Sequence, residues 1–278
     1  MSILEFTALL LFVAYAAGLL GSLTGLGGGV VLVPALVLLF KVDIHYAMGA
    51  SLISVIATSS GAAAAFVREG YTNLRIGMFL EVGAALGAIA GAFIAALLPA
   101  DVIAVIFGLV LLFSAYLSYR RKEDSEPNRE SHPWAIRLKM EDSYPTPAGP
   151  KSYRVYQVPT GFSLMGVAGV LSGLLGIGSG AVKVLAMDQA MRLPYKVSTT
   201  TSNFIIGITA AASAGIYFSR GYVDPGLTMP VMLGVLLGSL TGAKILVGAR
   251  SEALRLIFSL VILGLAIQMI YQGISGGL

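Results

Sequence analysis

Two glycine-rich stretches carry the residues whose types and spacing could do chemistry. They cover residues 21–29 and 172–180, and glycines recur at matching positions in both. Glycines this dense disfavour a continuous helix, so each stretch predicts a break inside an apolar segment. If a short helix begins just after each break, its free N–H groups and positive dipole end suit an anion. The predicted substrate-binding residues here are Thr24, Gly25, Gly27, Gly28, Gly29, Gly176, Gly178, Ser179 and Gly180.

Small hydroxyl side chains open the apolar segment that follows each glycine stretch. Hydroxyls and an amide can replace part of the hydration shell of an oxyanion without holding it too tightly. The predicted binding residues of this kind are Ser51, Ser54, Thr200, Thr201, Ser202 and Asn203. Both signals have a plainer alternative, in which the glycines only let helices pack closely and the hydroxyls bond to their own helix.

Four ionisable residues lie inside apolar segments, where such groups mark functional sites by default. Lys183 follows the second glycine stretch and is predicted to compensate a bound anion, and its counterpart in the first half is Leu32. Asp188 is expected either to pair with Lys183 or to lie near the membrane interface. Glu81 and Lys244 are expected to anchor helix ends at the interface, with a proton carrier as the alternative for Glu81.

The composition predicts a polytopic membrane protein that is built from helices. Of the 278 residues, 56% are apolar and only 12% are charged, far from the surface that a soluble domain needs. A helix needs about 20 apolar residues to span the bilayer. Suitable segments lie near residues 5–40, 47–67, 76–98, 101–119, 160–190, 198–218, 226–248 and 253–272.

An internal repeat divides these segments into two homologous halves, residues 1–120 and 160–278. At an offset of 151 the halves align without a gap, so that Gly25 falls on Gly176 and Ser51 on Ser202. Each half is therefore predicted to hold one glycine-broken segment followed by three transmembrane helices.

The distribution of basic residues predicts that the two halves are inverted repeats. Short cytoplasmic loops collect Lys and Arg, and the basic loops change places between the halves. Inversion requires an odd number of crossings in each half, so the broken segment must cross twice or dip in and return. The residues compared are Lys41, Arg68 and Arg75 in the first half and Arg192, Lys196, Arg220, Arg250 and Arg255 in the second.

The polar stretch at residues 121–159 carries much of the net charge of +4 and is predicted to be a cytoplasmic loop, not a nucleic-acid patch. Apolar and polar residues alternate over 134–140 and 153–158, around a Pro/Gly-rich region at 145–150. This pattern predicts a small β-hairpin outside the membrane. The stretch is either a regulatory or interaction element or a linker.

Enzymatic readings find little support in the sequence. The chain has no cysteine, and its two histidines, His45 and His132, have no sequence partner at ligand spacing. We therefore expect no enzyme activity, no metal and no cofactor. The phosphate-loop reading of the glycines fails because no Gly-Lys-Ser/Thr follows them.

Several of these features together resemble the sulfite exporter TauE/SafE family of membrane permeases. They are the Gly-Leu-Gly-Gly-Gly run before Pro34, the duplicated four-segment layout, the Gly-Ala-Ser-Leu run at 49–52 and the glycine-rich third segments. The resemblance implies transport of sulfite or of organosulfur anions such as sulfonates. Two positions depart from the expected pattern, Ala50 in place of a Thr and Ser179 inside the second glycine triplet. The residues to which the resemblance points are Gly25, Gly27, Gly28, Gly29, Ser51, Gly176, Gly178, Gly180, Thr201 and Ser202.

The sequence thus predicts a secondary transporter or facilitator in the cell membrane, with an alternating-access site for a small anion between the two broken segments. An anion channel with the same pore chemistry is the first alternative. A membrane scaffold that acts through the 121–159 loop is the second. The expected partners are the anionic substrate and the bilayer, and a homo-oligomer is compatible with the sequence.

Overall fold

The structure is a computed structural model that describes residues 3–24, 28–68, 70–119, 130–146, 149–178, 180–246 and 251–276. For some residues near the ends of these ranges, only the backbone is described. The predicted residues Gly25, Gly27 and Ser179 lie outside the described residues, and the side chain of Thr24 is not described.

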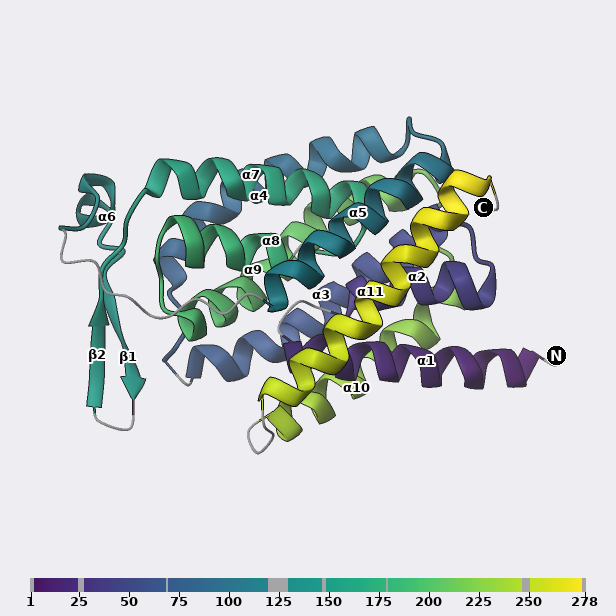
Figure 1. Ribbon diagram of the computed structural model, residues 1–278, viewed down its shortest axis with the longest axis horizontal. Coiled ribbons are helices and arrows are strands. Elements are labelled where there is room, and N and C mark those ends of the chain that lie inside the picture. Colours follow the sequence, from purple (N-terminus) through teal and green to yellow (C-terminus); the bar gives the residue numbers. More distant parts are fainter. Residues whose placement is uncertain are drawn as a thin grey trace.

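Helices dominate the described chain, as the composition predicted (Figure 1). The first half holds a long helix, a short helix and three further long helices, and the second half repeats that order around a π-helical turn, η1. The elements are α1 (Ile3–Thr24), α2 (Gly29–Phe40), α3 (Ile44–Arg68), α4 (Leu74–Ala95), α5 (Ala100–Tyr119), α6 (Pro133–Arg137), β1 (Asp142–Thr146), β2 (Gly149–Tyr153), α7 (Val158–Leu175), α8 (Gly180–Leu185), η1 (Ala186–Ala190), α9 (Tyr195–Ser219), α10 (Pro225–Leu246) and α11 (Ser251–Ser275).

Five helices in the described part are long and apolar enough to cross a membrane, namely α1, α4, α7, α9 and α10. Large apolar side chains such as Phe12, Phe93 and Tyr271 point outward from the bundle. In water such a surface would be unfavourable, but lipid covers it without cost. The chain is therefore a multi-pass membrane protein.

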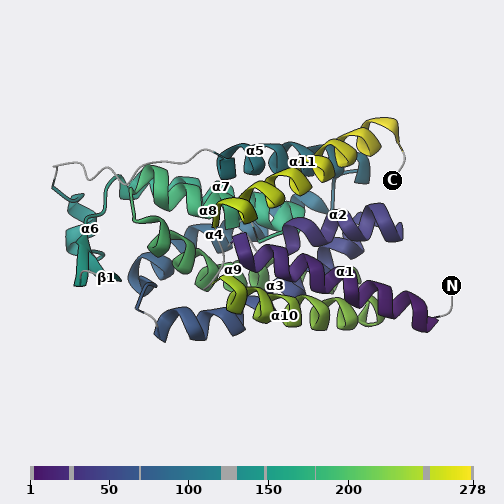
Figure 2. The same cartoon turned by 60° about the horizontal axis from the view of Figure 1, so that its bottom comes forward.

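The helices of the two halves are interleaved. α1 packs against α10 and α4 packs against α7, while α3 contacts α9 and α5 contacts α11. These pairs lie side by side in both Figure 1 and Figure 2. In the alignment of the two halves, α1 corresponds to α7 and α4 to α10, so the α1–α10 pair corresponds to the α7–α4 pair. The α3–α9 and α5–α11 pairs each join a helix to its own counterpart. The packing therefore repeats the duplication found in the sequence.

Glycines bring the paired helices into backbone contact. A Cβ placed on Gly87 of α4 would lie 2.2 Å from the carbonyl oxygen of Gly166 in α7. A Cβ on Gly238 of α10 would lie 2.0 Å from the carbonyl oxygen of Tyr15 in α1. The shift of 151 maps Gly87 onto Gly238 and Tyr15 onto Gly166. Small residues of this kind are what allow membrane helices to approach so closely.

Each broken segment forms two helices with a gap between them. α1 ends at Thr24 and α2 begins at Gly29, while α7 ends at Leu175 and α8 begins at Gly180. In Figure 1, α1 enters from the end of the bundle where both termini lie, and α7 enters from the end that carries the hairpin. α1 and α7 therefore run in opposite directions, and their inner ends lie in the middle of the bundle.

Residues 130–157, which we call the extramembrane unit, contain α6 and the hairpin formed by β1 and β2. The strands pair antiparallel, from Asp142 opposite Tyr153 to Thr146 opposite Gly149. A hairpin with its turn at 145–150 was predicted, and the structure has one there, but the strand positions predicted, 134–140 and 153–158, are wrong. Pro133 starts α6, because proline suits the first turn of a helix, and α7 already begins at Val158.

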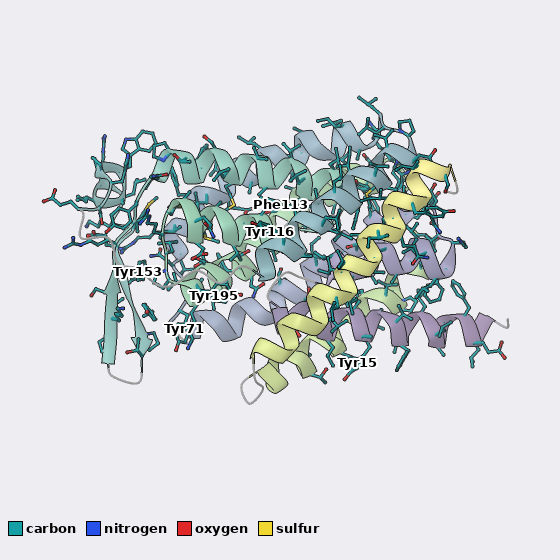
Figure 3. The ribbon with its side chains drawn as sticks, in the orientation of Figure 1. Tyr15, Tyr71, Phe113, Tyr116, Tyr153 and Tyr195 are labelled. Carbon is teal, nitrogen blue, oxygen red and sulfur yellow. The ribbon has the colours of Figure 1, made fainter. Side chains whose placement is uncertain are left out.

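Asn73 joins the extramembrane unit to the helix bundle. Its side chain caps α4 by accepting from the backbone N–H of Ile76 at 3.0 Å. Its amide donates to the carbonyl oxygen of Met140 at 2.8 Å and to the hydroxyl of Tyr153 at 2.7 Å. Figure 3 shows Tyr153 at this end of the bundle, together with Tyr71 and Tyr195. The unit is therefore docked onto the bundle through a buried polar contact.

We predict that Gly87→Ala destabilises the protein, whereas Gly264→Ala does not. The added methyl at Gly87 meets the backbone of α7, and overpacking of this kind costs about 1–3 kcal/mol. At Gly264 the methyl meets no described atom within 4 Å, so only the higher helix propensity of alanine remains. Thermal unfolding in detergent, followed by size-exclusion chromatography, measures both. Equal melting temperatures for the two variants would contradict the packing role of Gly87.

We predict that the extramembrane unit undocks in alkali because of Tyr153. Burial raises the pKa of this hydroxyl from its ordinary value of 10.0 to about 12. Docking is therefore fully favoured below about pH 10 and weakens between about pH 10 and 12, where the undocked hydroxyl ionises first. The fluorescence anisotropy of Trp134, the single tryptophan, should fall over this range. Tyr153→Phe should abolish that pH dependence. Tyr144→Phe is the control, because its ring packs next to that of Tyr153 and its loss should leave the pH dependence unchanged.

Candidate functional site

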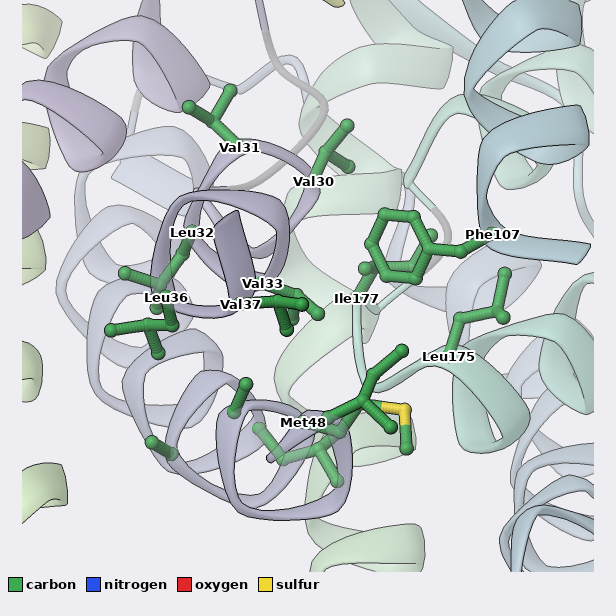
Figure 4. Packing of buried hydrophobic residues seen from close by; sticks show 14 of the residues in the cluster. Val30, Val31, Leu32, Val33, Leu36, Val37, Met48, Phe107, Leu175 and Ile177 are labelled. Atoms are coloured by element: carbon green, nitrogen blue, oxygen red, sulfur yellow. The ribbon is translucent and has the colours of Figure 1, made fainter. Parts of the chain in front are cut away.

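The two broken segments touch each other in the interior of the bundle. A Cβ placed on Gly29, the first residue of α2, would lie 3.2 Å from the Cα of Ile177 in the second break. Figure 4 shows Ile177 between α2 and Phe107 of α5. All of these residues are buried. The breaks that the sequence places 151 residues apart therefore form one region.

The N-terminus of α2 faces a buried hydroxyl for which the described part of the chain supplies no partner. Gly28 precedes the helix and supplies no side-chain cap. The hydroxyl of Ser51 in α3 would lie 2.6 Å from a Cβ on Gly29, and it has no hydrogen-bond partner among the described residues although it is fully buried. An unpaired buried hydroxyl costs free energy. An anion at this helix end would satisfy the hydroxyl and complement the helix dipole.

The second break repeats the position of the serine, but there the hydroxyl makes a long hydrogen bond. Ser202 of α9 is the counterpart of Ser51, and Gly180 is the counterpart of Gly29. The hydroxyl of Ser202 donates to the carbonyl oxygen of Gly180 at 3.5 Å. Each half therefore presents a serine to the glycine that starts its short helix.

Two glycines of the second break hold backbone conformations that other residues rarely adopt. Gly176 has a φ of +65° and Gly178 a φ of +74°. A Cβ on Gly176 would lie 2.6 Å from the Cβ of Met48, and one on Gly178 would lie 2.6 Å from Ile206. Both the left-handed φ and the close packing therefore require glycine at these positions.

The other predicted hydroxyl residues do not all gather at the breaks. Ser54 donates to the carbonyl oxygen of Ala50 at 2.8 Å, and Thr200 donates to that of Lys196 at 2.9 Å, so both bond to their own helices. Thr201 is buried and accepts a hydrogen bond from the backbone N–H of Asn73 at 3.1 Å. Asn203 is half-buried. Thr201, which precedes Ser202 in the chain, thus connects α9 to Asn73, the residue that docks the extramembrane unit.

Lys183 is fully buried and pairs with Glu81. Its Nζ lies 3.5 Å from a carboxylate oxygen of Glu81 and donates a hydrogen bond to the hydroxyl of Thr209. That hydroxyl lies 2.7 and 2.9 Å from the two oxygens of Glu81. The ion pair therefore joins α4, α8 and α9 inside the bundle.

This ion pair corrects two expectations from the sequence. Glu81 was expected to anchor a helix end at the interface, but it is only 4% exposed and lies in the bundle interior. Asp188 was one expected partner of Lys183, and the structure gives that place to Glu81. Glu81 and Lys183 are 102 residues apart, so only packing could bring them together. The side chain of Lys244 is not described.

The other half of the protein has no equivalent charge. A shift of 151 residues relates Glu81 to Met232, Lys183 to Leu32 and Thr209 to Thr58. Leu32 is fully buried and Met232 is half-buried. The same backbone arrangement is thus charged on one side of the molecule and apolar on the other. Among the residues that the structure describes, no group of three or more His, Asp or Glu side chains could hold a metal ion.

We predict that Lys183→Leu alone destabilises the protein, because it leaves Glu81 buried without a partner. The expected loss in the free energy of unfolding is roughly 3–5 kcal/mol. Adding Glu81→Met reproduces the apolar residues of the other half and should restore most of that loss. Denaturant unfolding of the single and double variants in detergent micelles measures the coupling. A double variant no more stable than Lys183→Leu would show that the two charges are not coupled.

The chain matches a known family over almost its entire length. A family model described as "Sulfite exporter TauE/SafE" matches residues 10–269. "Probable membrane transporter protein YunE" of Bacillus subtilis (strain 168) is 30% identical, over 96% of this chain and 98% of that protein. "Probable membrane transporter protein YdhB" of the same strain is 29% identical, over 85% and 89%.

A more distant relative is a "Probable membrane transporter protein" of Xylella fastidiosa (strain 9a5c), which is 26% identical over 94% of this chain and 92% of that protein. No solved structure matches the chain. The resemblance predicted from the glycine runs and the duplicated layout is confirmed by the family match. The chain therefore belongs to the sulfite exporter TauE/SafE family of membrane transporters.

Proposed function

We propose that this protein transports a small anion, sulfite or an organosulfur anion such as a sulfonate, as a secondary transporter or facilitator. The anion binds where the two broken segments meet and is exposed alternately to each side of the membrane. The observation that carries the proposal is the buried hydroxyl of Ser51, which has no partner within the described ranges and lies at the N-terminus of α2, where Gly28 supplies no side-chain cap. The family match supports the sulfur-containing substrate.

The charge and backbone of the site favour an anion over a cation. The first N–H groups of α2 point toward the break, and a helix N-terminus carries a partial positive charge. Lys183 lies three residues after Gly180 on the second broken segment, and it can add positive charge to the site only when its ion pair with Glu81 opens or Glu81 is protonated. Broken helices in paired positions are the usual place for substrate in secondary transporters.

Alternating access needs two halves that can exchange roles, and we propose that the halves are inverted repeats. The opposite directions of α1 and α7 in Figure 1 support this arrangement. The self-pairing of α3 with α9 and of α5 with α11 is also what a two-fold axis in the membrane plane requires. A rocking motion of this kind would uncover the breaks first from one side and then from the other.

We further propose that the extramembrane unit lies in the cytoplasm. Basic residues concentrate at its end of the bundle, and short cytoplasmic loops collect Lys and Arg. The loops and first helical turns at the opposite end hold Lys41 and Arg220 together with several acidic residues. The basic residues on the side of the unit are Arg75, Arg137, Lys139, Lys151, Arg154, Arg192 and Lys196, and the acidic residues opposite are Glu5, Asp43, Asp101 and Asp224.

Uptake of radiolabelled sulfite into proteoliposomes tests the proposal, with sulfate, thiosulfate, taurine and a small sulfonate as competitors. We expect saturable uptake that at least one of these anions inhibits. Ser51→Ala should weaken apparent affinity about 10- to 100-fold, because a hydrogen bond to a charged group is worth roughly 1.5–3 kcal/mol. Ser114→Ala is the control, since this hydroxyl of α5 bonds to its own helix at the carbonyl oxygen of Val110.

Two outcomes would contradict the proposal. A folded protein that moves none of these anions would rule out the substrate class. Flux that does not saturate and shows no counterflow would indicate an anion channel with the same pore chemistry.

A further inference from the structure

We propose that the Glu81–Lys183 pair couples anion transport to a proton, which makes the protein a proton–anion symporter. A proton bound by Glu81 releases Lys183 to hold the substrate anion, so that both cross the membrane together. This inference rests on the proposed function and adds the coupling ion to it. No covalent step is involved, since the proton enters the carboxylate on one side of the membrane and leaves it on the other.

The pair is positioned to sense the substrate site. Lys183 belongs to α8, the short helix that begins at Gly180 directly after the second break. Thr209 lies seven residues after Ser202 on α9, which is two turns and about 10 Å along the helix. Both residues that hold Glu81 therefore sit on elements that also line the break. A change at the break can move them relative to Glu81.

Charge balance provides the coupling. In the structure, Glu81 and Lys183 neutralise each other inside the bundle. An anion that binds to Lys183 while Glu81 stays ionised would leave a net negative charge in a membrane interior, which is costly. For a monovalent anion such as a sulfonate, a proton on Glu81 restores neutrality, and for a divalent anion it halves the net negative charge. Anion and proton therefore favour the binding of each other, and this linkage is reciprocal.

Thr209 allows Glu81 to exist in both protonation states. A hydroxyl can donate to a carboxylate and can also accept from a carboxylic acid or an ammonium group. In the structure, the Thr209 hydroxyl contacts both Glu81 oxygens and Lys183. When Lys183 turns to an anion, the protonated Glu81 can still donate to Thr209. Neither state leaves the buried carboxyl without a partner.

The other charged groups near this site lie toward the ends of their elements. Arg75 of α4 donates to the carbonyl oxygen of Lys139, and Lys196 of α9 lies over the ring of Tyr71. η1 carries Asp188, and α7, which packs against α4, has no charged residue. The groups that interact with Glu81 itself are Lys183 and Thr209. Protonation of Glu81 therefore acts on Lys183, the charged group that it contacts.

A purely structural role explains the pair less well. The other half of the molecule builds the equivalent packing with Met232 and Leu32. A buried ion pair is often no more stabilising than apolar residues of similar volume. Packing alone therefore does not require these charges, whereas coupling does.

Proteoliposomes with a trapped pH-sensitive dye test the proposal with methanesulfonate and thiosulfate, whose charges do not change near neutral pH. An inward gradient of the transported anion should acidify the lumen of wild-type vesicles. Uptake should rise as the pH falls, by up to about tenfold per pH unit, the limit for one linked proton. Glu81→Gln should keep anion counterflow but lose the dye signal and the pH dependence. Glu81→Asp should restore both with a shifted pH profile.

Met232→Gln is the matched control, because it adds the same amide at the equivalent position of the other half and should leave the dye signal intact. Wild-type anion flux without acidification would overturn the coupling and leave the proposed function standing. Proton movement that persists in Glu81→Gln would also overturn it, as would a failure of Met232→Gln to preserve the signal. No flux of either anion in the wild type would contradict the proposed function, and the coupling with it.

Discussion

The close contact between the backbones of α4 and α7, and of α1 and α10, is the constraint on which the rest of the structure depends. Lipid offers no hydrophobic force between helices, so association relies on van der Waals packing. Glycines such as Gly87 and Gly238 let the helix axes approach until any Cβ would collide. Each contact joins a helix of one half to a helix of the other. The halves are therefore held together along helices that flank the two breaks.

That packing also makes the irregular backbone of the breaks tolerable. In hydrocarbon, chain segments outside helices survive only where protein surrounds them or where they line a cavity. Here the two breaks lie against each other, with Ile177 beside Gly29, and α3 covers the second break, with Met48 beside Gly176. The packing around the breaks must also offset the free-energy cost of the Ser51 hydroxyl, which is buried at the α2 N-terminus without a partner in the part of the chain that the structure describes.

The two halves differ in the charge that they bury. Their backbones and glycine contacts repeat, yet only one carries the Glu81–Lys183 pair, while Met232 and Leu32 occupy the other. Symmetry supplies two similar arrangements between which a transporter can alternate. In the coupling that we propose, the Glu81–Lys183 pair is the group that responds to the charge of the substrate. The extramembrane unit adds a further link, since Asn73 connects it to Thr201 beside Ser202.

The sequence by itself determined the membrane class, the duplication, the breaks and the family, because hydropathy, glycine spacing and an ungapped repeat are local or periodic properties. It placed Gly29, Gly176 and Ser51 at the breaks for the same reason. Only the tertiary structure decided which side chains meet. Glu81 and Lys183 are far apart in the chain, and no periodicity relates them. The predicted positions of the hairpin strands were also wrong. Pro133 starts a helix where the first strand was predicted, and Tyr153, where the second was predicted to begin, docks onto Asn73 at the end of β2.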